Sequence, residues 1–421
     1  MMGEKIIRFA KKNVVTLLFV ALCIFTTVYS GQSASFILQE LISRICRNAV
    51  LILSLLMPVL CGMGLNFSIV LGAAAGQIAL ILITHWNIGG LPGMALCLLI
   101  ATAISILFGM FAGFIFNRTV GQEMITGMIV GYFAKGVFDL IFLILVGTWL
   151  IPIHNPKLIL AGGVGLKNTI DLNPDVKYVF DKVLQVSFLD CLLYGLLIML
   201  LVTAALLLIR ILRQKKTLRE AVRACLPAII TTGVFAVALA VFRLVPSLYQ
   251  AASFSEVPVF TVLLIAGVCL LNAFLCRTKL GQDIRTCGQN MQVAAASGIR
   301  VGRTRIAATV ISTVIAAWGQ IIFLQNMGLI NTYTSHEQVG TYAVAALLVG
   351  GASIRKATIP QVFIGALLFH LLFFTMPLAG NQLFNDSQIG EYFRVFISYG
   401  VIAVALALHA WNRLGGKKKK S

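Results

Sequence analysis

Residues 48 to 86 have the sequence NAVLILSLLMPVLCGMGLNFSIVLGAAAGQIALILITHW, which contains no lysine, arginine, aspartate or glutamate. A helix that crosses a lipid bilayer needs about 20 apolar residues, so this run is too long for one crossing. Glycines and polar side chains gather in its middle, between Cys61 and Gln77. The run therefore predicts two membrane helices with a break between them.

The break allows two interpretations. Non-helical backbone at membrane depth is tolerated only where protein or a water-filled cavity satisfies its polar groups, so a glycine-interrupted helix indicates a transport pathway. Small residues also let neighbouring helices pack closely, and this needs no pathway. Both interpretations stay open.

The composition of the whole chain excludes a water-soluble globular domain. Of the 421 residues, 59% are hydrophobic and 11% are charged, where soluble domains have about 45–50% and about 25%. The net charge of +19 would suit a nucleic-acid partner only if the basic residues shared one exposed face. They lie instead in short clusters between apolar runs, which is typical of membrane orientation.

We expect an all-α bundle of about twelve transmembrane helices. The segment 340–353 is short for a full crossing, so it is tilted, broken or continued by its neighbours. The expected crossings lie near residues 14–31, 48–65, 70–86, 92–116, 123–148, 187–210, 224–245, 257–276, 306–326, 340–353, 359–378 and 392–412.

Basic residues in alternate connections indicate the orientation, because lysine and arginine stay on the cytoplasmic side. The poorer set holds six: Arg44, Arg47, Lys157, Lys167, Lys177 and Lys182. The richer set holds 24: Lys5, Arg8, Lys11, Lys12, Arg118, Arg210, Arg213, Lys215, Lys216, Arg219, Arg223, Arg277, Lys279, Arg285, Arg300, Arg303, Arg305, Arg355, Lys356, Arg413 and Lys417 to Lys420. This bias places both termini in the cytoplasm, which requires an even number of crossings.

The segment 278–305 has the sequence TKLGQDIRTCGQNMQVAAASGIRVGRTR and lies on the expected cytoplasmic side. It resembles the permeases of ATP-binding-cassette importers for simple sugars, nucleosides and branched-chain amino acids. Nine residues match the motif that follows a membrane helix in that family: Leu280, Gly281, Ile284, Arg285, Gly288, Asn290, Ser297, Gly298 and Ile299.

This resemblance implies that residues 277–305 are the coupling segment, which docks onto a separate ATPase and transmits its closure to the membrane helices. The residues agree, since Gln292 to Ser297 favours a short helix between the breakers Gly288 and Gly298. Many members have an acidic residue after the asparagine, where this chain has Met291, so a specific charge contact with the ATPase is not predicted. An amphipathic loop without a partner is the alternative.

The resemblance covers residues 48–150 and 257–412. The two helices near 187–245 look like an inserted hairpin in a single permease domain of residues 1–421, which braces the bundle or contacts a second subunit. The sequence Ala75-Gly-Gln77 and the stretch Gln122 to Ala134 resemble the nucleoside branch. A monosaccharide is the alternative solute.

Polar side chains within spans are costly in lipid, so they face the bundle interior or a cavity. Their amide and hydroxyl groups suit a neutral hydroxylated solute. Candidates for the solute pathway are Asn66, Ser68, Gln77, Glu123, Thr126, Gln320, Gln325 and Asn326. Lys135 and Asp139, four residues apart on one expected helix, are predicted to form an ion pair. A structural pair is favoured over a substrate or proton site, because a lone buried charge would cost far more.

The chain has no GxxxxGK[ST] phosphate loop, and Gly415-Gly-Lys417 lies in a basic tail without a preceding strand. We therefore expect a transport subunit that is not an enzyme and holds no metal or cofactor, with ATP and Mg bound by a partner ATPase. The other expected partners are an extracytoplasmic solute-binding protein, a second permease subunit of the same or a related chain, and membrane lipid, with no nucleic acid polymer. The expected location is the bacterial cytoplasmic membrane.

Two other classes of protein are weaker alternatives. A secondary transporter would show paired repeats with interrupted helices in both halves, and it would not need the segment 280–299. A membrane-embedded enzyme would need clustered histidine, aspartate or glutamate. The five histidines are instead scattered: His85, His154, His336, His370 and His409.

Overall fold

A computed structural model describes residues 14–153, 155–212 and 218–418. Its helices are α2 (Val14–Tyr29), α3 (Ala34–Leu53), α4 (Leu56–Leu60), α5 (Ile69–His85), α6 (Gly90–Arg118), α7 (Glu123–Leu140), η1 (Ile141–Leu145), α8 (Phe188–Leu212), α9 (Leu218–Leu244), α10 (Pro246–Phe254), α11 (Val259–Leu275), α12 (Lys279–Gln289), α13 (Met291–Ala296), α14 (Val301–Met327), α15 (Val339–Val349), α16 (Ile359–Phe384) and α17 (Ser387–Lys418). Four short strands complete the fold: β1 (Thr169–Asp171), β2 (Gln185–Ser187), β3 (Glu256–Pro258) and β4 (Leu329–Asn331). The expected helical membrane protein is confirmed.

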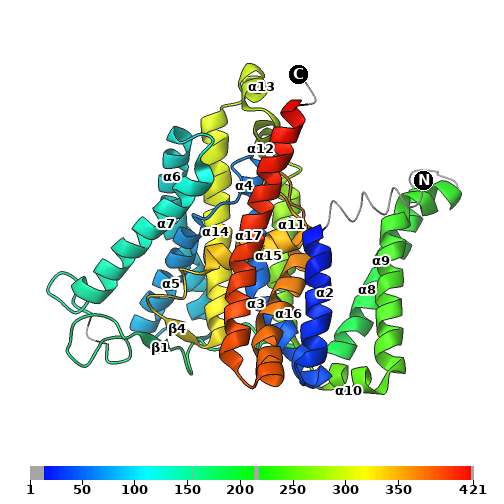
Figure 1. The fold of residues 1–421 in the computed structure, drawn as a ribbon, viewed down its shortest axis with the longest axis horizontal. Coiled ribbons are helices and arrows are strands. Elements are labelled where there is room, and N and C mark those ends of the chain that lie inside the picture. The colour runs from blue at the N-terminus through cyan, green and yellow to red at the C-terminus, as the bar shows by residue number, and fades with distance from the viewer. Residues whose placement is uncertain (1–13, 154, 213–217, 419–421) are drawn as a thin grey trace. The chain divides into compact units, whose positions relative to one another are not determined.

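The helices form two compact units, which we describe separately. Unit 1 comprises residues 1–31, 44–182 and 261–421, and unit 2 comprises residues 32–43 and 183–260. In unit 1, α12 and α13 lie at one end, and β1 and β4 lie at the other (Figure 1). β1 pairs with β4 in antiparallel register.

Helix α14 packs closely against α5 and α6 in unit 1, and glycines make this possible. A Cβ atom at Gly72 of α5 would lie 2.3 Å from the carbonyl oxygen of Thr313, and one at Gly76 would lie 2.5 Å from that of Ala317. On α6, a Cβ atom at Gly109 would lie 2.2 Å from Thr313 Oγ1. Gly72 and Gly76 of the long apolar run therefore serve helix packing, as Gly109 does on α6.

The predicted break in that run is confirmed. Helix α4 ends at Leu60 and α5 begins at Ile69. Gly62 and Gly64 lie in the non-helical backbone between them, with φ values of +77° and +75° that favour glycine. Gly62 and Gly64 therefore permit the break itself, and the interpretation of the break as part of a transport pathway stays a prediction.

The prediction that the first of these helices begins near residue 48 is wrong, because α3 begins at Ala34. Arg44 and Arg47 therefore lie within a helix and not in a connection. Their guanidinium groups lie against aromatic rings, Arg44 5.3 Å from the ring centre of Phe374 and Arg47 6.0 Å from that of Phe323. Such contacts let cationic side chains stay inside a helical bundle. The helix therefore begins well before the uncharged apolar run does.

Unit 2 contains the expected hairpin, since α8 and α9 pack against each other within residues 187–245. The ring centres of Phe188 and Phe242 lie 5.3 Å apart. β2 pairs with β3, and the backbone N–H of Glu256 donates a hydrogen bond of 2.8 Å to Oε1 of Gln39. Residues of the first half of α3 thus belong to the same unit as the hairpin.

Six described helices are long and apolar enough to cross a membrane, or up to eight if each sharply bent pair is one crossing. Three shorter apolar helices accompany them. One is α15, whose 11 residues confirm that the segment near 340–353 is short. The number of twelve crossings stays a prediction. Part of the basic clusters behind the predicted orientation lies outside the described residues: Lys5, Arg8, Lys11, Lys12, Arg213, Lys215, Lys216, Lys419 and Lys420.

Candidate functional site

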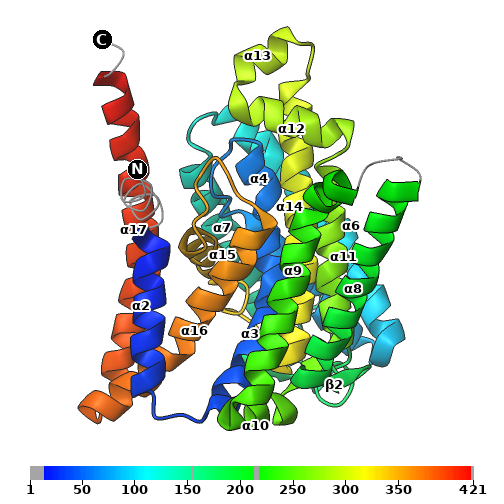
Figure 2. The same ribbon diagram turned by 90° about the vertical axis from the view of Figure 1, so that its right-hand side faces the viewer.

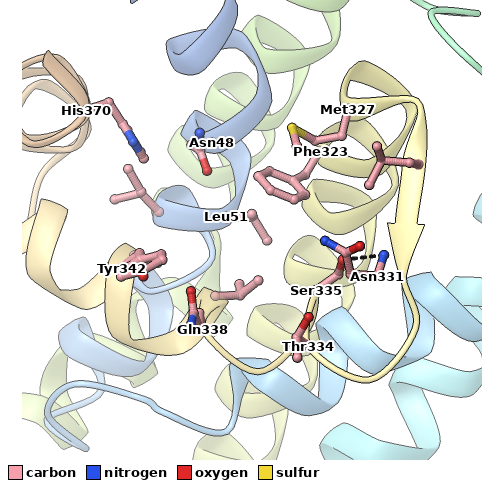
Figure 3. A pocket seen from close by; sticks show the side chains of 14 residues that line it. Asn48, Leu51, Phe323, Met327, Asn331, Thr334, Ser335, Gln338, Tyr342 and His370 are labelled. Atoms are coloured by element: carbon pink, nitrogen blue, oxygen red, sulfur yellow. Dashed lines mark hydrogen bonds between the residues drawn. The ribbon is translucent and has the colours of Figure 1, made fainter. Parts of the chain in front are cut away.

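A cavity of about 200 Å³ lies within unit 1 (Figure 3). It is lined by α3, α14, α15, α16 and the segment 329–339, and its lining combines aromatic, aliphatic, amide and hydroxyl side chains. The lining residues are Asn48, Leu51, Ile52, Phe323, Met327, Leu329, Asn331, Thr334, Ser335, Gln338, Val339, Tyr342, Ala343 and His370. Ligand sites commonly combine an apolar wall with a few polar groups in this way.

Hydrogen bonds fix two of the polar lining residues. The Asn48 side-chain amide donates a bond of 2.8 Å to the carbonyl oxygen of Arg44 on the preceding turn of α3. Ser335 Oγ accepts a bond of 3.1 Å from the backbone N–H of Asn331, which holds the turn between β4 and α15. The Tyr342 ring lies at the opposite side of the cavity from Phe323 in Figure 3, so two aromatic rings face the same space.

His370 of α16 also lines the cavity. Its side chain is 5% exposed, and it packs against Phe369 with 5.3 Å between ring centres. Its Nδ1 atom is buried and has no hydrogen-bond partner among the described residues. The imidazole that lines the cavity is therefore mostly buried, and one of its nitrogens forms no hydrogen bond within the part of the chain that the structure describes.

The eight predicted pathway residues lie elsewhere, and none of them is among the described residues that line this cavity. Asn66 accepts hydrogen bonds from the backbone N–H and hydroxyl of Ser68, and its amide donates to Ser312 Oγ over 3.3 Å. These contacts tie the break between α4 and α5 to α14. Thr126 is half-buried near the start of α7, where its backbone N–H donates to Gln122.

The amides of three further pathway candidates donate hydrogen bonds either to Asp181, which lies just before unit 2 in the sequence, or to Ser335 in the turn between β4 and α15. The amides of Gln325 and Asn326 both donate to Oδ2 of the buried Asp181, over 3.0 and 2.7 Å. Gln320 donates to the carbonyl oxygen of Ser335 over 3.2 Å, directly behind the cavity wall. These buried amides hold the wall in place, and their assignment to the solute pathway stays a prediction.

Gln77 is bound to the same turn. Its amide donates to the carbonyl oxygen of Thr332 over 2.5 Å, and its Oε1 lies 3.1 Å from Nδ1 of His336. His336 lies outside the helices, between β4 and α15, and burial lowers its pKa to about 4. A buried neutral imidazole therefore connects the turn between β4 and α15 to Gln77 of α5.

The predicted ion pair between Lys135 and Asp139 is confirmed, with 2.8 Å between Nζ and Oδ2. Glu337 lies 3.8 Å from the same ammonium group, which the sequence did not suggest. The pair thus connects α7 to the turn that precedes α15, and this contact fits a structural role.

The segment 277–305 forms two short helices, and the second confirms the prediction for residues 292–297. Thr278 caps α12 by accepting a hydrogen bond from the N–H of Gly281. The Asn290 side chain caps α13 by accepting from the N–H groups of Gln292 and Val293, over 2.9 and 3.2 Å. This is the geometry in which asparagine stabilises a helix start.

The nine motif residues of this segment divide between two faces. Three of them, Gly281, Ile284 and Gly288, are buried or closely packed toward the membrane helices, and Leu280 and Ile299 pack beside them. Asn290, Ser297 and Gly298 are exposed with α13, while Arg285 donates to the carbonyl oxygen of Cys276 over 2.6 Å. Figure 2 shows α13 at the extreme end of unit 1, beyond α12.

Helix α12 meets the break after α4 through two glycines. A Cβ atom at Gly288 would lie 2.0 Å from the carbonyl oxygen of Leu60, and one at Gly62 would lie 2.8 Å from Cα of Gly288. The two backbones therefore touch directly, without side chains between them.

A protein-family model matches a part of the chain that includes α12 and α13. The family model described as "Branched-chain amino acid transport system / permease component" matches residues 182–406, which is more than half of the chain. The chain belongs to this permease family. The matched residues include α8 and α9 as well as the segment 277–305.

Curated relatives of the permease are named as sugar and autoinducer importers. The autoinducer 2 import system permease protein LsrC of Klebsiella pneumoniae is 29% identical over 154 residues, which are 35% of this chain and 42% of that protein. The xylose transport system permease protein XylH of Haemophilus influenzae is 25% identical over 41% of this chain and 43% of that protein. The D-allose transport system permease protein AlsC of Escherichia coli is 27% identical over 38% of this chain and 47% of that protein.

The chain spans less than half the length of each of these relatives. No solved structure matches.

The cavity residues were not predicted from the sequence, although one polar stretch among them could have indicated the site. Residues 331–338, with the sequence NTYTSHEQ, form a polar stretch between two apolar segments. Asn48 and His370 gave no such signal, because Asn48 directly follows Arg47 at the start of the long apolar run and His370 is a lone polar residue within residues 362–374. Only the fold, which places α3, α15 and α16 around one cavity, reveals that they share it.

Proposed function

We propose that this permease is the membrane-spanning subunit of a bacterial ATP-driven importer, and that the cavity holds the solute during transport. The main support is the path of α3 and α4. Asn48, Leu51 and Ile52 of α3 line the cavity, and Leu60 at the end of α4 touches Gly288 of α12. One continuous element therefore contacts both the candidate solute site and the candidate coupling segment.

This connection gives the importer its mechanism. ATP and Mg bind to a separate ATPase, whose closure moves the exposed helix α13 and the attached α12. Because α12 meets the break after α4 backbone to backbone, its movement is passed to α3 and so to the cavity wall. The glycines at the break provide backbone freedom for the change between outward-facing and inward-facing states. Val293 of α13, with 54% of its surface exposed, would be covered by the ATPase.

For the solute, a monosaccharide now fits better than the nucleoside favoured by the short sequence matches. The relatives are named for xylose, D-allose and autoinducer 2, and none of these names is a nucleoside. Gln77, part of the nucleoside-type match, is already bound to Thr332 and His336. The amide, hydroxyl and aromatic lining of the cavity suits a sugar ring.

The finer topology belongs to the same proposal. The permease would cross the bacterial cytoplasmic membrane about twelve times with both termini inside, as the distribution of basic residues predicts. It would pair with a second permease subunit and receive solute from an extracytoplasmic binding protein. The hairpin of α8 and α9 would brace the bundle or contact that second subunit.

Reconstitution tests this function. The permease is placed in liposomes with the ATPase subunit that copurifies with it and with the binding protein, and uptake of labelled D-xylose and D-allose is measured. We expect uptake that requires ATP and stops with an ATPase that cannot hydrolyse it. Uptake down a gradient by the permease alone would instead identify a secondary transporter.

A further inference from the structure

One buried nitrogen distinguishes the α16 side of the cavity. His370 is 5% exposed, and its Nδ1 has no hydrogen-bond partner among the described residues. Buried polar atoms in proteins are almost always paired, and an unpaired one is costly. Figure 3 shows the imidazole extending from α16 toward the cavity, so a molecule bound there would meet this ring.

We propose that His370 is a specificity-determining residue that binds one ring hydroxyl of the solute through its imidazole ring. This inference rests on the proposed function, since it assigns a role to one wall of the same cavity. A neutral imidazole has one donor and one acceptor nitrogen, and a hydroxyl group both donates and accepts. A hydroxyl therefore pairs with either ring nitrogen in either tautomer, whereas a carboxylate only accepts and an ammonium group only donates.

The surroundings of His370 narrow the class of solute further. The guanidinium group of Arg44 lies 5.8 Å from the ring centre of Phe373, three residues after His370 on α16, so a cationic solute would be repelled from this end of the cavity. Asn48 also lines the cavity on this side, as Figure 3 shows. The amide and hydroxyl groups of the lining suit a polyhydroxylated ring.

The remaining walls suit the faces of such a ring. Phe323 and Tyr342 lie on different sides of the cavity. The Tyr342 ring is held by an edge-to-face contact with Phe373, with 5.0 Å between ring centres. Fixed aromatic rings bind the apolar face of a ring, while the amides and His370 bind its hydroxyl edge. The cavity is thus a site for a neutral cyclic polyol with a hydroxyl directed at α16.

Binding to the full-length chain in detergent micelles tests this role. Saturation-transfer NMR is titrated with D-xylose and D-allose, and then with the monodeoxy forms of the sugar that binds. We compare the wild type with His370→Phe, which keeps a ring against Phe369 but removes both nitrogens, and with His370→Asn, which keeps a hydrogen-bonding group. His85→Phe is the matched control, because His85 also has a buried, unpaired Nδ1 but does not line the cavity.

We expect His370→Phe to weaken binding of the parent sugar about tenfold, the loss of one hydrogen bond. One monodeoxy sugar should bind wild type and His370→Phe equally well, and that sugar identifies the hydroxyl. His370→Asn should recover part of the affinity, and His85→Phe should bind like the wild type. Equal losses for every sugar, or no loss, would overturn the role of His370 while leaving the sugar site intact. Failure of the wild type to bind either sugar would overturn the proposed solute as well.

Discussion

The guanidinium group of Arg305 donates a hydrogen bond of 2.6 Å from Nη2 to Oε1 of Glu123, and both side chains are buried. The same nitrogen donates to the carbonyl oxygen of Phe116 over 2.9 Å, and Nη1 lies 3.4 Å from the sulfur of Met291. The prediction that Arg305 lies in a connection is therefore wrong, since it lies within α14, which begins at Val301. The pair joins the start of α14 to α6, α7 and α13.

Replacing Glu123 with alanine should destabilise the permease strongly. The change leaves the buried guanidinium group without its counter-charge, and loss of one partner of a buried pair costs about 3–5 kcal/mol. Thermal denaturation in detergent, followed by circular dichroism, measures the loss. The exposed pair between Lys157 and Asp175, 2.9 Å apart, is the control. Asp175→Asn should cost only about 0–1 kcal/mol, and equal losses at both sites would contradict the structural importance of the Arg305 pair.

Replacing Gly72 with alanine should also destabilise the fold, because the new Cβ would lie 2.3 Å from a backbone carbonyl of α14. Overpacking of this kind typically costs about 1–3 kcal/mol. Gly136→Ala on α7 is the matched control, since no atom lies within 4 Å of its Cβ position. Alanine favours a helix over glycine by about 1 kcal/mol, so this control should leave stability unchanged or raise it. The same denaturation measurement compares them, and similar effects of both changes would disprove the close contact between α5 and α14.

These two sites show what sequence can and cannot predict here. The broken run 48–86 follows from its length and its glycines, because bilayer thickness sets the length of a helix. Whether a given glycine allows close helix packing or a break in the helix depends on the neighbouring helix. Gly72 faces α14, whereas Gly62 has a positive φ at the break.

The candidate site was less predictable for a related reason. The predicted pathway residues Gln320 and Gln325 do lie inside the bundle. Hydrogen bonds to Ser335 and Asp181 occupy these amides, and such partners from distant segments cannot be read from spacing. The short helix α13 was predictable because the breakers Gly288 and Gly298 on either side of it are local in sequence.

Stability should fall as the pH drops below about 6.5, and His336 should account for part of the fall. Burial lowers the pKa of His336 to about 4, with Lys135 also lowering it and Asp139 opposing the shift. The unfolded chain, with an ordinary histidine pKa, therefore binds a proton more readily than the folded one. The stability that this site contributes is present at neutral pH and is lost between about pH 6.5 and 4, by about 3 kcal/mol.

The variant His336→Phe isolates this contribution, because phenylalanine keeps a ring against Phe138, whose centre lies 4.5 Å from that of the imidazole. The variant should be less stable than the wild type at pH 7, and the difference should shrink as the pH approaches 4. Melting temperatures measured at intervals of half a pH unit give both curves. Parallel curves would show that His336 does not titrate on unfolding.

Replacing Gly288 with alanine should uncouple ATP hydrolysis from transport. The new methyl group would lie 2.0 Å from the carbonyl oxygen of Leu60 and 3.0 Å from the backbone nitrogen of Gly62. Because both neighbours are backbone atoms, α12 must move away from the break, and its movement would no longer reach α3. In liposomes with the ATPase and the binding protein, we expect ATP-driven sugar uptake to fall by about tenfold or more. Overpacking of this kind costs about 1–3 kcal/mol, and about 1.4 kcal/mol corresponds to a factor of ten. ATP hydrolysis should continue.

Gly267→Ala on α11 is the control for this change, since no atom lies within 4 Å of its Cβ position. It should leave uptake and hydrolysis near the wild-type values. Sugar binding to Gly288→Ala in micelles should also be preserved, because Gly288 does not line the cavity. If uptake and hydrolysis fall together, the alanine has prevented assembly with the ATPase, and the defect lies at the docking surface. If neither falls, the contact between Gly288 and Leu60 does not carry the coupling, and the path from α13 through α4 to the cavity is refuted.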